Sequence, residues 1–237
     1  MKQLFLVVTL LVIYLSNAQV KIGGVDSSNE NSSSLLELKS TNQGFLPSII
    51  IGTQQWTSEN LNVLTYRNGD VIPQVTDAKA WATLKTGAWC YYNIDELNGP
   101  IYGKLYNWYA VHDPRGLAPK GWHIPTDAEW TTLTDNLGGE TRAGGKMKTT
   151  ENTTSRNGKW ATPNTRATNE SGFSGLPGGY RDFNGTFYYI GFYGYWWSSS
   201  EFSKPSALFR ILYYYLDNAA SSDYHKIAGF SVRCIKD

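Results

Sequence analysis

The segment 207–215 most constrains the fold of this chain, because a strand formed by it would be apolar on both faces. Successive side chains of a strand point to opposite faces of the sheet. One face would carry Leu208, Arg210, Leu212 and Tyr214. The other face would carry Phe209, Ile211, Tyr213 and Tyr215. Either a second layer covers each face, or one face stays exposed as an aromatic patch. The sequence leaves both alternatives open, and we favour the exposed patch.

The composition predicts a turn-rich fold with little regular helix. The chain of 237 residues has 9 Trp, 16 Tyr, 9 Phe and 23 Gly but only 2 Met. A chain of this length can bury most of its apolar surface in one core. We therefore expect one α+β domain with two short helices, small antiparallel sheets and long irregular loops.

Both predicted helices start at capping signals. Thr126 is a preferred N-cap residue, and Glu129 completes a capping box. Trp130 and Leu133 share one face of that helix, which we expect to be buried. A shorter helix is predicted to begin at residues 76–79. Extended segments are expected at 48–52, 56–63, 88–92 and 227–235, and the stretch 103–111 could form another.

The first 18 residues are typical of a signal peptide. Lys2 precedes an apolar run from Leu4 to Leu15, and Ser16-Asn17-Ala18 offers small residues for cleavage. The run is shorter than the roughly 20 residues that a spanning helix needs. We expect a secreted protein of the periplasm, cell surface or extracellular space, without membrane insertion after cleavage. Residues 19–48 are polar and predict an extended lead, and residues 49–237 form the domain.

The charge balance gives no reason to expect a nucleic-acid partner. The chain has 21 Lys and Arg against 20 Asp and Glu, so it has no strong long-range attraction for phosphate backbones. The three histidines have no metal-ligand spacing, and neither a nucleophile elbow nor a phosphate loop is present. We therefore expect a protein that is not an enzyme and needs no cofactor.

Two groups of oxygen-bearing residues were considered as calcium ligands. Asp217 with Asn218 and Asp182 with Asn184 each offer fewer oxygens than the six to eight that calcium takes. We therefore expect no metal site.

Cys90 and Cys234 are the two cysteines of the chain. In an exported protein this pair predicts a structural disulfide. A catalytic pair is the alternative, but the cysteines lack the local Cys-x-x-Cys spacing of redox motifs.

Aromatic residues are dense beyond residue 185, among Ser, Gly and Asn. Exposed tyrosines in such a setting are typical of adaptable binding surfaces, and a tyrosine ring can also stack on the apolar face of a sugar. We therefore predict a ligand-binding surface within residues 183–228. Its residues are Tyr188, Tyr189, Phe192, Tyr193, Tyr195, Phe209, Tyr213, Tyr215, Asp217, Tyr224 and His225.

Several motifs resemble the Fibrobacter succinogenes major paralogous domain, a family of exported bacterial proteins. They are, in chain order, Ile51-Gly52-Thr53-Gln54-Gln55-Trp56, Glu59-Asn60-Leu61-Asn62-Val63, Trp89-Cys90-Tyr91-Tyr92-Asn93, residues 103–111, residues 119–130, Leu176-Pro177-Gly178-Gly179-Tyr180-Arg181, Trp196-Trp197-Ser198-Ser199-Ser200-Glu201, and Gly229-Phe230-Ser231-Val232-Arg233-Cys234. In addition, residues 34–47 resemble a segment near the start of many surface proteins of the Bacteroidota.

The resemblance implies a C-type-lectin-like fold, shared with formylglycine-generating enzymes, in which the chain ends meet and a long irregular excursion carries the ligand face. The cysteine pair suits this arrangement. Related lectin-fold proteins diversify their C-terminal surface, so the aromatic positions could vary among relatives. The calcium-binding Glu-Pro-Asn, Gln-Pro-Asp and Trp-Asn-Asp motifs of classical lectins are absent from the sequence.

We therefore predict an exported recognition or adhesion module for an extracellular protein or glycan. The first alternative is a structural cell-surface component that self-associates. A formylglycine-generating-like oxidase is less favoured. The sequence does not give the oligomeric state.

Overall fold

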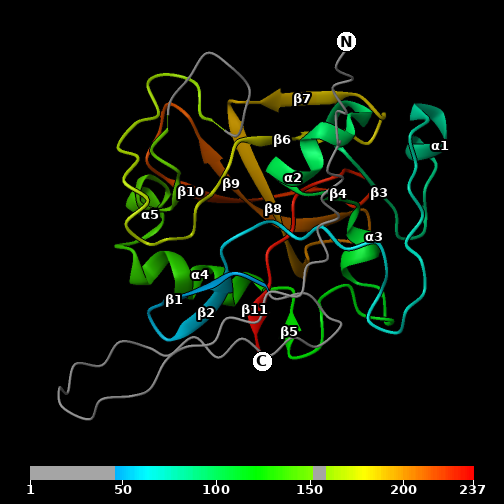
Figure 1. Ribbon diagram of the computed structural model, residues 1–237, viewed down its shortest axis with the longest axis horizontal. Coiled ribbons are helices and arrows are strands. Elements are labelled where there is room, and N and C mark those ends of the chain that lie inside the picture. Colours follow the sequence, from blue (N-terminus) through cyan, green and yellow to red (C-terminus); the bar gives the residue numbers. More distant parts are fainter. Residues whose placement is uncertain (1–45, 152–158) are drawn as a thin grey trace, which may run out of the picture. The chain divides into compact units, whose positions relative to one another are not determined.

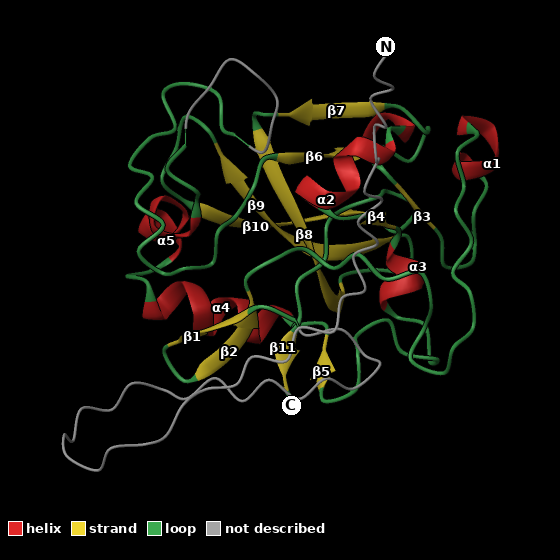
Figure 2. Ribbon diagram, in the orientation of Figure 1, coloured by secondary structure: helices red, strands yellow, loops and turns green. Residues whose placement is uncertain are grey.

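The computed structural model describes residues 46–151 and 159–237, which form an α+β fold (Figures 1 and 2). The predicted signal peptide and most of the predicted lead lie outside the described residues. The helices of the described part are α1 (Ala78–Ala82), α2 (Gly99–Tyr102), α3 (Trp108–Val111), α4 (Asp127–Asn136) and α5 (Glu140–Met147), with short 3-10 helices at Tyr92–Ile94 and Glu96–Asn98.

A four-stranded sheet joins the beginning and the end of the domain. Its order is β1 (Ser48–Ile51), β2 (Gln54–Thr57), β11 (Ile235–Lys236) and β5 (Trp122–His123). Ile235 pairs with both Trp56 and His123. In Figure 1 the blue first strands therefore lie beside the red last strand.

The larger sheet has five strands and carries the C-terminal aromatic residues. Its order is β10 (Ala219–His225), β9 (Ser206–Tyr213), β8 (Tyr193–Glu201), β6 (Gly178–Arg181) and β7 (Phe187–Ile190). The pairings are antiparallel except that β6 runs parallel to β8. A two-stranded sheet of β3 (Trp89–Cys90) and β4 (Leu105–Tyr106) completes the described strands. The five-stranded sheet is larger than the small antiparallel sheets that the sequence predicted, and its one parallel pairing was not expected.

Both predicted helices are confirmed. Asp77 caps α1 by accepting from the backbone N–H of Ala80. In α4 both halves of the capping box between Thr126 and Glu129 are formed. Trp130 of α4 is fully buried, as its helical spacing predicted.

Three further helices and several strand limits differ from the prediction. The segment 103–111 contains β4 but continues as helix α3, because the side chain of Asn107 caps that helix. Within 227–235 only Ile235 belongs to a strand, and Gly229, Phe230 and Ser231 form isolated bridges. Helix α5 was hidden by its two internal glycines, since glycine weakens the helical signal.

Strand β9 lies between two core clusters, so both of its faces are covered along most of its length. Phe209 and Ile211 belong to a cluster with Trp197 and Phe230. Leu212, on the opposite face, belongs to a cluster with helix α4. The exposed patch that we favoured is therefore limited to the end of this strand and the loop that follows it.

The predicted disulfide is not formed. Cys90 and Cys234 are free and buried. Cys90 lies in the two-stranded sheet, whereas Cys234 precedes β11 of the terminal sheet. The two residues also belong to different core clusters. The two thiols thus lie in different parts of the domain.

Candidate functional site

Six tyrosines form a connected group of rings, here called the tyrosine face. The ring centroids are 5.7 Å apart for Tyr180 and Tyr188, and 4.7 Å apart for Tyr189 and Tyr193. They are 5.3 Å apart for Tyr193 and Tyr213, and 5.7 Å apart for Tyr213 and Tyr215. Its members are Tyr180, Tyr188, Tyr189, Tyr193, Tyr213 and Tyr215.

Strand register brings these rings together. Tyr180 of β6 is the direct partner of Tyr188 in β7, and Tyr193 of β8 is the partner of Tyr213 in β9. Directly opposed residues of an antiparallel pair have side chains on the same face, within contact distance. Tyr215 follows β9 in the loop to β10. Four strands and one loop, spread over 36 positions of the sequence from 180 to 215, thus supply one surface.

The face is open to solvent. Tyr189 and Tyr215 are 47% and 45% exposed, and Tyr188 is 37% exposed. Tyr193 and Tyr213 are partly buried and support the exposed rings. Such a surface offers large rigid rings whose hydroxyls can bond to a ligand.

Tyr189 has a backbone conformation that is rare for a large side chain. Its φ is +65°, in the left-handed region where a bulky residue is an outlier. This conformation interrupts the strand alternation, and the successive rings of Tyr188 and Tyr189 both contact Tyr180, at 5.7 and 6.2 Å. Backbone strain of this kind costs about 1–3 kcal/mol and gathers at functional sites.

The other predicted binding residues are not members of the tyrosine face. Tyr195 and Phe209 are 7% and 6% exposed and pack on Phe230, so they belong to the core. Phe192 is exposed and packs on Tyr214, whose ring in turn lies 5.1 Å from that of Tyr215 in the tyrosine face.

Three more predicted binding residues are not among the six rings, namely Tyr224, His225 and Asp217. Tyr224 contacts Tyr180 and donates a hydrogen bond to Asp182, while His225 packs on exposed Phe183. The carboxylate of Asp217 pairs with Arg166 at 3.0 Å.

Tyr180 is the member that sequence reasoning missed. In the sequence it lies in the family motif Leu176–Arg181, outside the residues predicted for the binding surface. No local pattern marks it, because its strand has only four residues and begins with two glycines. Its ring nevertheless contacts those of Tyr188, Tyr189, Tyr195 and Tyr224.

The hydroxyls of Tyr193 and Tyr213 stay protonated at neutral pH. Burial and the neighbouring Tyr215 raise the pKa of Tyr193. Burial, Tyr215 and Glu140 raise the pKa of Tyr213. These hydroxyls can therefore both donate and accept hydrogen bonds under physiological conditions.

The carboxylates of the two candidate calcium groups have protein partners. Asp182 accepts from the backbone N–H of Phe183 and from the hydroxyl of Tyr224, at 2.8 and 2.9 Å. Asp217 is paired with Arg166. Across residues 46–151 and 159–237, no group of three or more His, Cys, Asp or Glu side chains is arranged to hold a metal ion.

Two adjoining cavities lie away from the tyrosine face. Their volumes are about 320 and 590 Å³, and both are lined by Glu59, Asn60 and Asn62. The fully buried Arg233 borders the smaller cavity. Its guanidinium donates to Asn60 and to the backbone carbonyls of Thr57 and Ser174. These hydrogen bonds connect the first and last described segments of the domain, so the buried guanidinium has a structural role.

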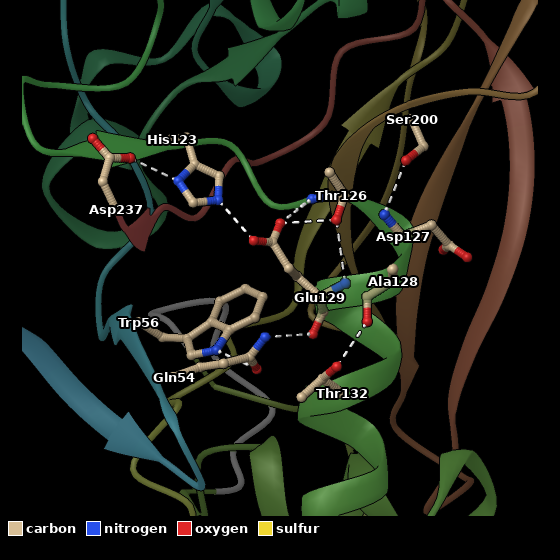
Figure 3. A network of polar contacts seen from close by, with 10 residues as sticks. All are labelled: Gln54, Trp56, His123, Thr126, Asp127, Ala128, Glu129, Thr132, Ser200 and Asp237. Atoms are coloured by element: carbon tan, nitrogen blue, oxygen red, sulfur yellow. Dashed lines mark hydrogen bonds and ion pairs between the residues drawn. The ribbon is translucent and has the colours of Figure 1, made fainter.

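A polar network around His123 joins the last residue to helix α4 (Figure 3). Nδ1 of His123 lies 2.8 Å from Asp237, and Nε2 lies 2.8 Å from Glu129. Glu129 also accepts from the backbone N–H of Thr126. The imidazole is thus held between two carboxylates at the end of the chain.

Comparison with known proteins identifies the family but gives no characterised relative. No curated protein and no solved structure matches the chain. The family model described as the Fibrobacter succinogenes major domain matches residues 49–236. That match covers most of the chain and confirms the family that the sequence motifs suggested. The chain therefore belongs to the Fibrobacter succinogenes major domain family.

Proposed function

We propose that this protein is an exported recognition or adhesion module that binds an extracellular protein or glycan through the tyrosine face. The observation that carries the proposal is the open group of six contacting tyrosine rings, three of which are at least 37% exposed. Contiguous exposed aromatic rings are a feature of protein interaction surfaces and ligand-binding grooves. The left-handed backbone of Tyr189 supports the same conclusion.

We further propose that the domain has a C-type-lectin-like fold. The pairing of β2 with β11 supports this, because it brings the domain's two ends together. Long stretches between β5 and β6 contain no strand among their described residues, in keeping with an irregular excursion.

Export is proposed from the signal-peptide pattern of residues 1–18. Among the described residues, no helix is long and apolar enough to cross a membrane.

An oxidase activity has little support from the thiols. Burial raises the pKa of Cys90 to about 12, against the attraction of Arg181. Burial raises the pKa of Cys234 to about 12 as well, against Arg233 and Arg67. Thiols in such surroundings are poor nucleophiles and poor metal ligands at neutral pH.

A ligand screen tests the proposal directly. The domain is probed on a glycan array and a panel of host-surface proteins, with and without calcium. The Tyr189→Ala/Tyr215→Ala variant removes two of the most exposed rings of the face. Phe202→Ala is the matched control, because Phe202 is 62% exposed and contributes no ring to the face. We expect specific binding that the double variant loses and the control keeps.

The outcome also distinguishes the two proposed roles of the surface. Suppose that neither panel shows binding, that the wild type is an oligomer by light scattering, and that the double variant is a monomer. These results would instead indicate the self-associating structural component. Binding that survives in the double variant would contradict the tyrosine face as the site.

The face is also proposed to vary among relatives while its supporting residues stay constant. The supporting positions include Gly191, Gly194, Trp196 and Leu212, which are buried. Sequencing of sibling isolates tests this idea, and it fails if positions 188, 189, 193, 213 and 215 vary no more than those four.

A further inference from the structure

The side chain of Lys148 is buried beneath the loop that carries part of the tyrosine face. Lys148 directly follows helix α5 and is 0% exposed. Its Nζ donates to the backbone carbonyls of Thr165 at 2.9 Å, Tyr213 at 2.9 Å and Leu216 at 2.8 Å. An ammonium group has three N–H donors, so each of them has a carbonyl acceptor.

This ammonium has no direct acidic partner in the part of the chain that the structure describes. Asp217 attracts it only through space, and the ring of Trp160 lies 5.5 Å from Nζ. Burial lowers the pKa of Lys148 to about 8, so most molecules carry the full set of three donors at neutral pH. A buried charge is costly, and here the carbonyl oxygens of separate chain segments compensate for it.

Two of the three carbonyls bracket the turn at the start of the β9–β10 loop. Tyr213 ends β9, and Leu216 lies three residues later. Both carbonyls converge on one ammonium, which closes the turn that contains Tyr215. The third carbonyl belongs to Thr165, whose backbone N–H donates to Tyr214 at 2.8 Å.

Helix α5 supports the same loop from a second direction. The backbone N–H of Gly145 donates to the carbonyl of Asp217 at 3.1 Å. A Cβ atom on Gly144 would lie 2.1 Å from the carbonyl oxygen of Asn218, so helix and loop backbones are in direct contact. The end of α5 and the side chain of Lys148 thus form one platform.

We infer that Lys148 is a positioning residue, whose ammonium fixes the β9–β10 loop and thereby the rings of Tyr213 and Tyr215 in the tyrosine face. The consequence for ligand binding rests on the proposed function, but the effect on the loop does not. Lys148 would touch no ligand, because it is fully buried.

The test is Lys148→Met, which keeps the unbranched side chain as far as Cε and removes all three donors. Amide hydrogen exchange is measured by mass spectrometry on peptides that cover residues 213–218. We expect exchange there to become at least about tenfold faster, because the loop loses its closing contacts. Exchange in strands β1 and β2 should follow only the change in global stability.

Two controls separate positioning from general loss of stability. Lys146→Met changes a lysine of the same helix that pairs with Glu170 near the surface, and it should leave loop exchange unchanged. Ile72→Ala destabilises the core from a site in the segment before α1. At equal loss of melting temperature, it should not accelerate residues 213–218 selectively.

Ligand affinity supplies the functional outcome. For a ligand whose binding the Tyr189→Ala/Tyr215→Ala variant abolishes, Lys148→Met should weaken binding about tenfold or more, and Lys146→Met should not. Faster loop exchange with unchanged affinity would restrict the role of Lys148 to the loop and overturn its role in the face. Loop exchange equal to that of Lys146→Met would overturn the inference altogether, while the proposed function would stand.

A measurement on the unmodified protein covers the case in which Lys148→Met does not fold. Ammonium protons that are buried and hydrogen-bonded exchange slowly and give a separate nitrogen–proton NMR signal. We expect one such signal at pH 6 for Lys148 and none for Lys146. Rapid exchange of both would overturn the inference.

Discussion

At the scale of single residues, Arg210 is the side chain that fits its strand pattern least well, because it is a charged residue on a buried face. Arg210 shares a strand face with Leu208 and Leu212, yet it is 4% exposed. Its guanidinium pairs with Asp127 at 2.9 Å and donates to the hydroxyl of Thr131. Helix α4 therefore covers this face of β9 with a polar patch at its first turn.

The Arg210–Asp127 pair gives an asymmetric prediction. Asp127→Ala leaves a buried guanidinium without its carboxylate and should destabilise the fold by about 3 kcal/mol. Arg210→Met removes the buried charge and leaves a carboxylate that is already partly exposed, so it should cost less. Urea unfolding of both variants measures the difference. Equal losses would contradict the assignment of the burial penalty to Arg210.

His123 makes the stability of the fold depend on pH. Burial alone would lower the pKa of His123, but its hydrogen bonds to Glu129 and Asp237 outweigh burial and raise it. A raised pKa in the folded state means that the contribution is full below the unfolded value of about 6.5. The contribution is lost as the pH rises through the folded pKa.

The check is the melting temperature of the wild type and of His123→Gln between pH 5 and pH 9. The wild type should exceed the variant most at the acidic end of this range, and the gap should narrow as the pH rises. A gap that stays constant across the series would show that protonation of His123 contributes nothing.

At the scale of elements, helix α5 is determined by its contacts more than by its own sequence. Gly144 and Gly145 weaken it as a helix, yet they allow its backbone to contact the β9–β10 loop and residue 166. These close contacts leave no room for a Cβ atom at either position. What the sequence did not reveal is the loop that approaches them.

Gly144→Ala tests this close approach. In an exposed helix the substitution would stabilise by up to about 1 kcal/mol. Here the added Cβ would meet the backbone of Asn218 at 2.1 Å, so we expect a loss of about 1–3 kcal/mol. Thr141→Ala, at an exposed position of the same helix, is the control and should change stability little. Thermal unfolding gives both values, and a stabilised Gly144→Ala variant would refute the close contact.

At the scale of the whole molecule, the two ends of the domain are held together by hydrogen bonds and not by a disulfide. The backbone N–H of Thr57 donates to the carbonyl of Cys234, and Arg233 donates to the carbonyl of Thr57. These bonds connect the first and last strands of the domain, which is the role expected of the predicted disulfide. Cys90 lies in a different layer and takes no part.

Thiol counting checks this arrangement. Without reductant, the native protein should react with a thiol reagent at neither cysteine, because both are buried and have pKa values of about 12. After unfolding in denaturant it should react at two. Intact mass after alkylation gives the count, and no labelling of the unfolded chain would establish a bridge and contradict the structure.

The sequence by itself determined the features that depend on neighbours along the chain. The Thr126 capping box, the start of α1 at Asp77 and the strand at 48–51 need only local hydrogen bonds and local alternation, so they could be predicted. The family was also recognisable, since its motifs are contiguous.

Only the tertiary structure decided which aromatic residues are surface and which are core. Tyr193 and Tyr195 lie two residues apart on the same face of β8, and they look alike in the sequence. Phe230, which is distant in sequence, stacks on Tyr195 at 5.1 Å and helps to bury it, while Tyr193 stays at the margin with Tyr213. Burial depends on which remote segment covers a side chain, and strand periodicity carries no information about that.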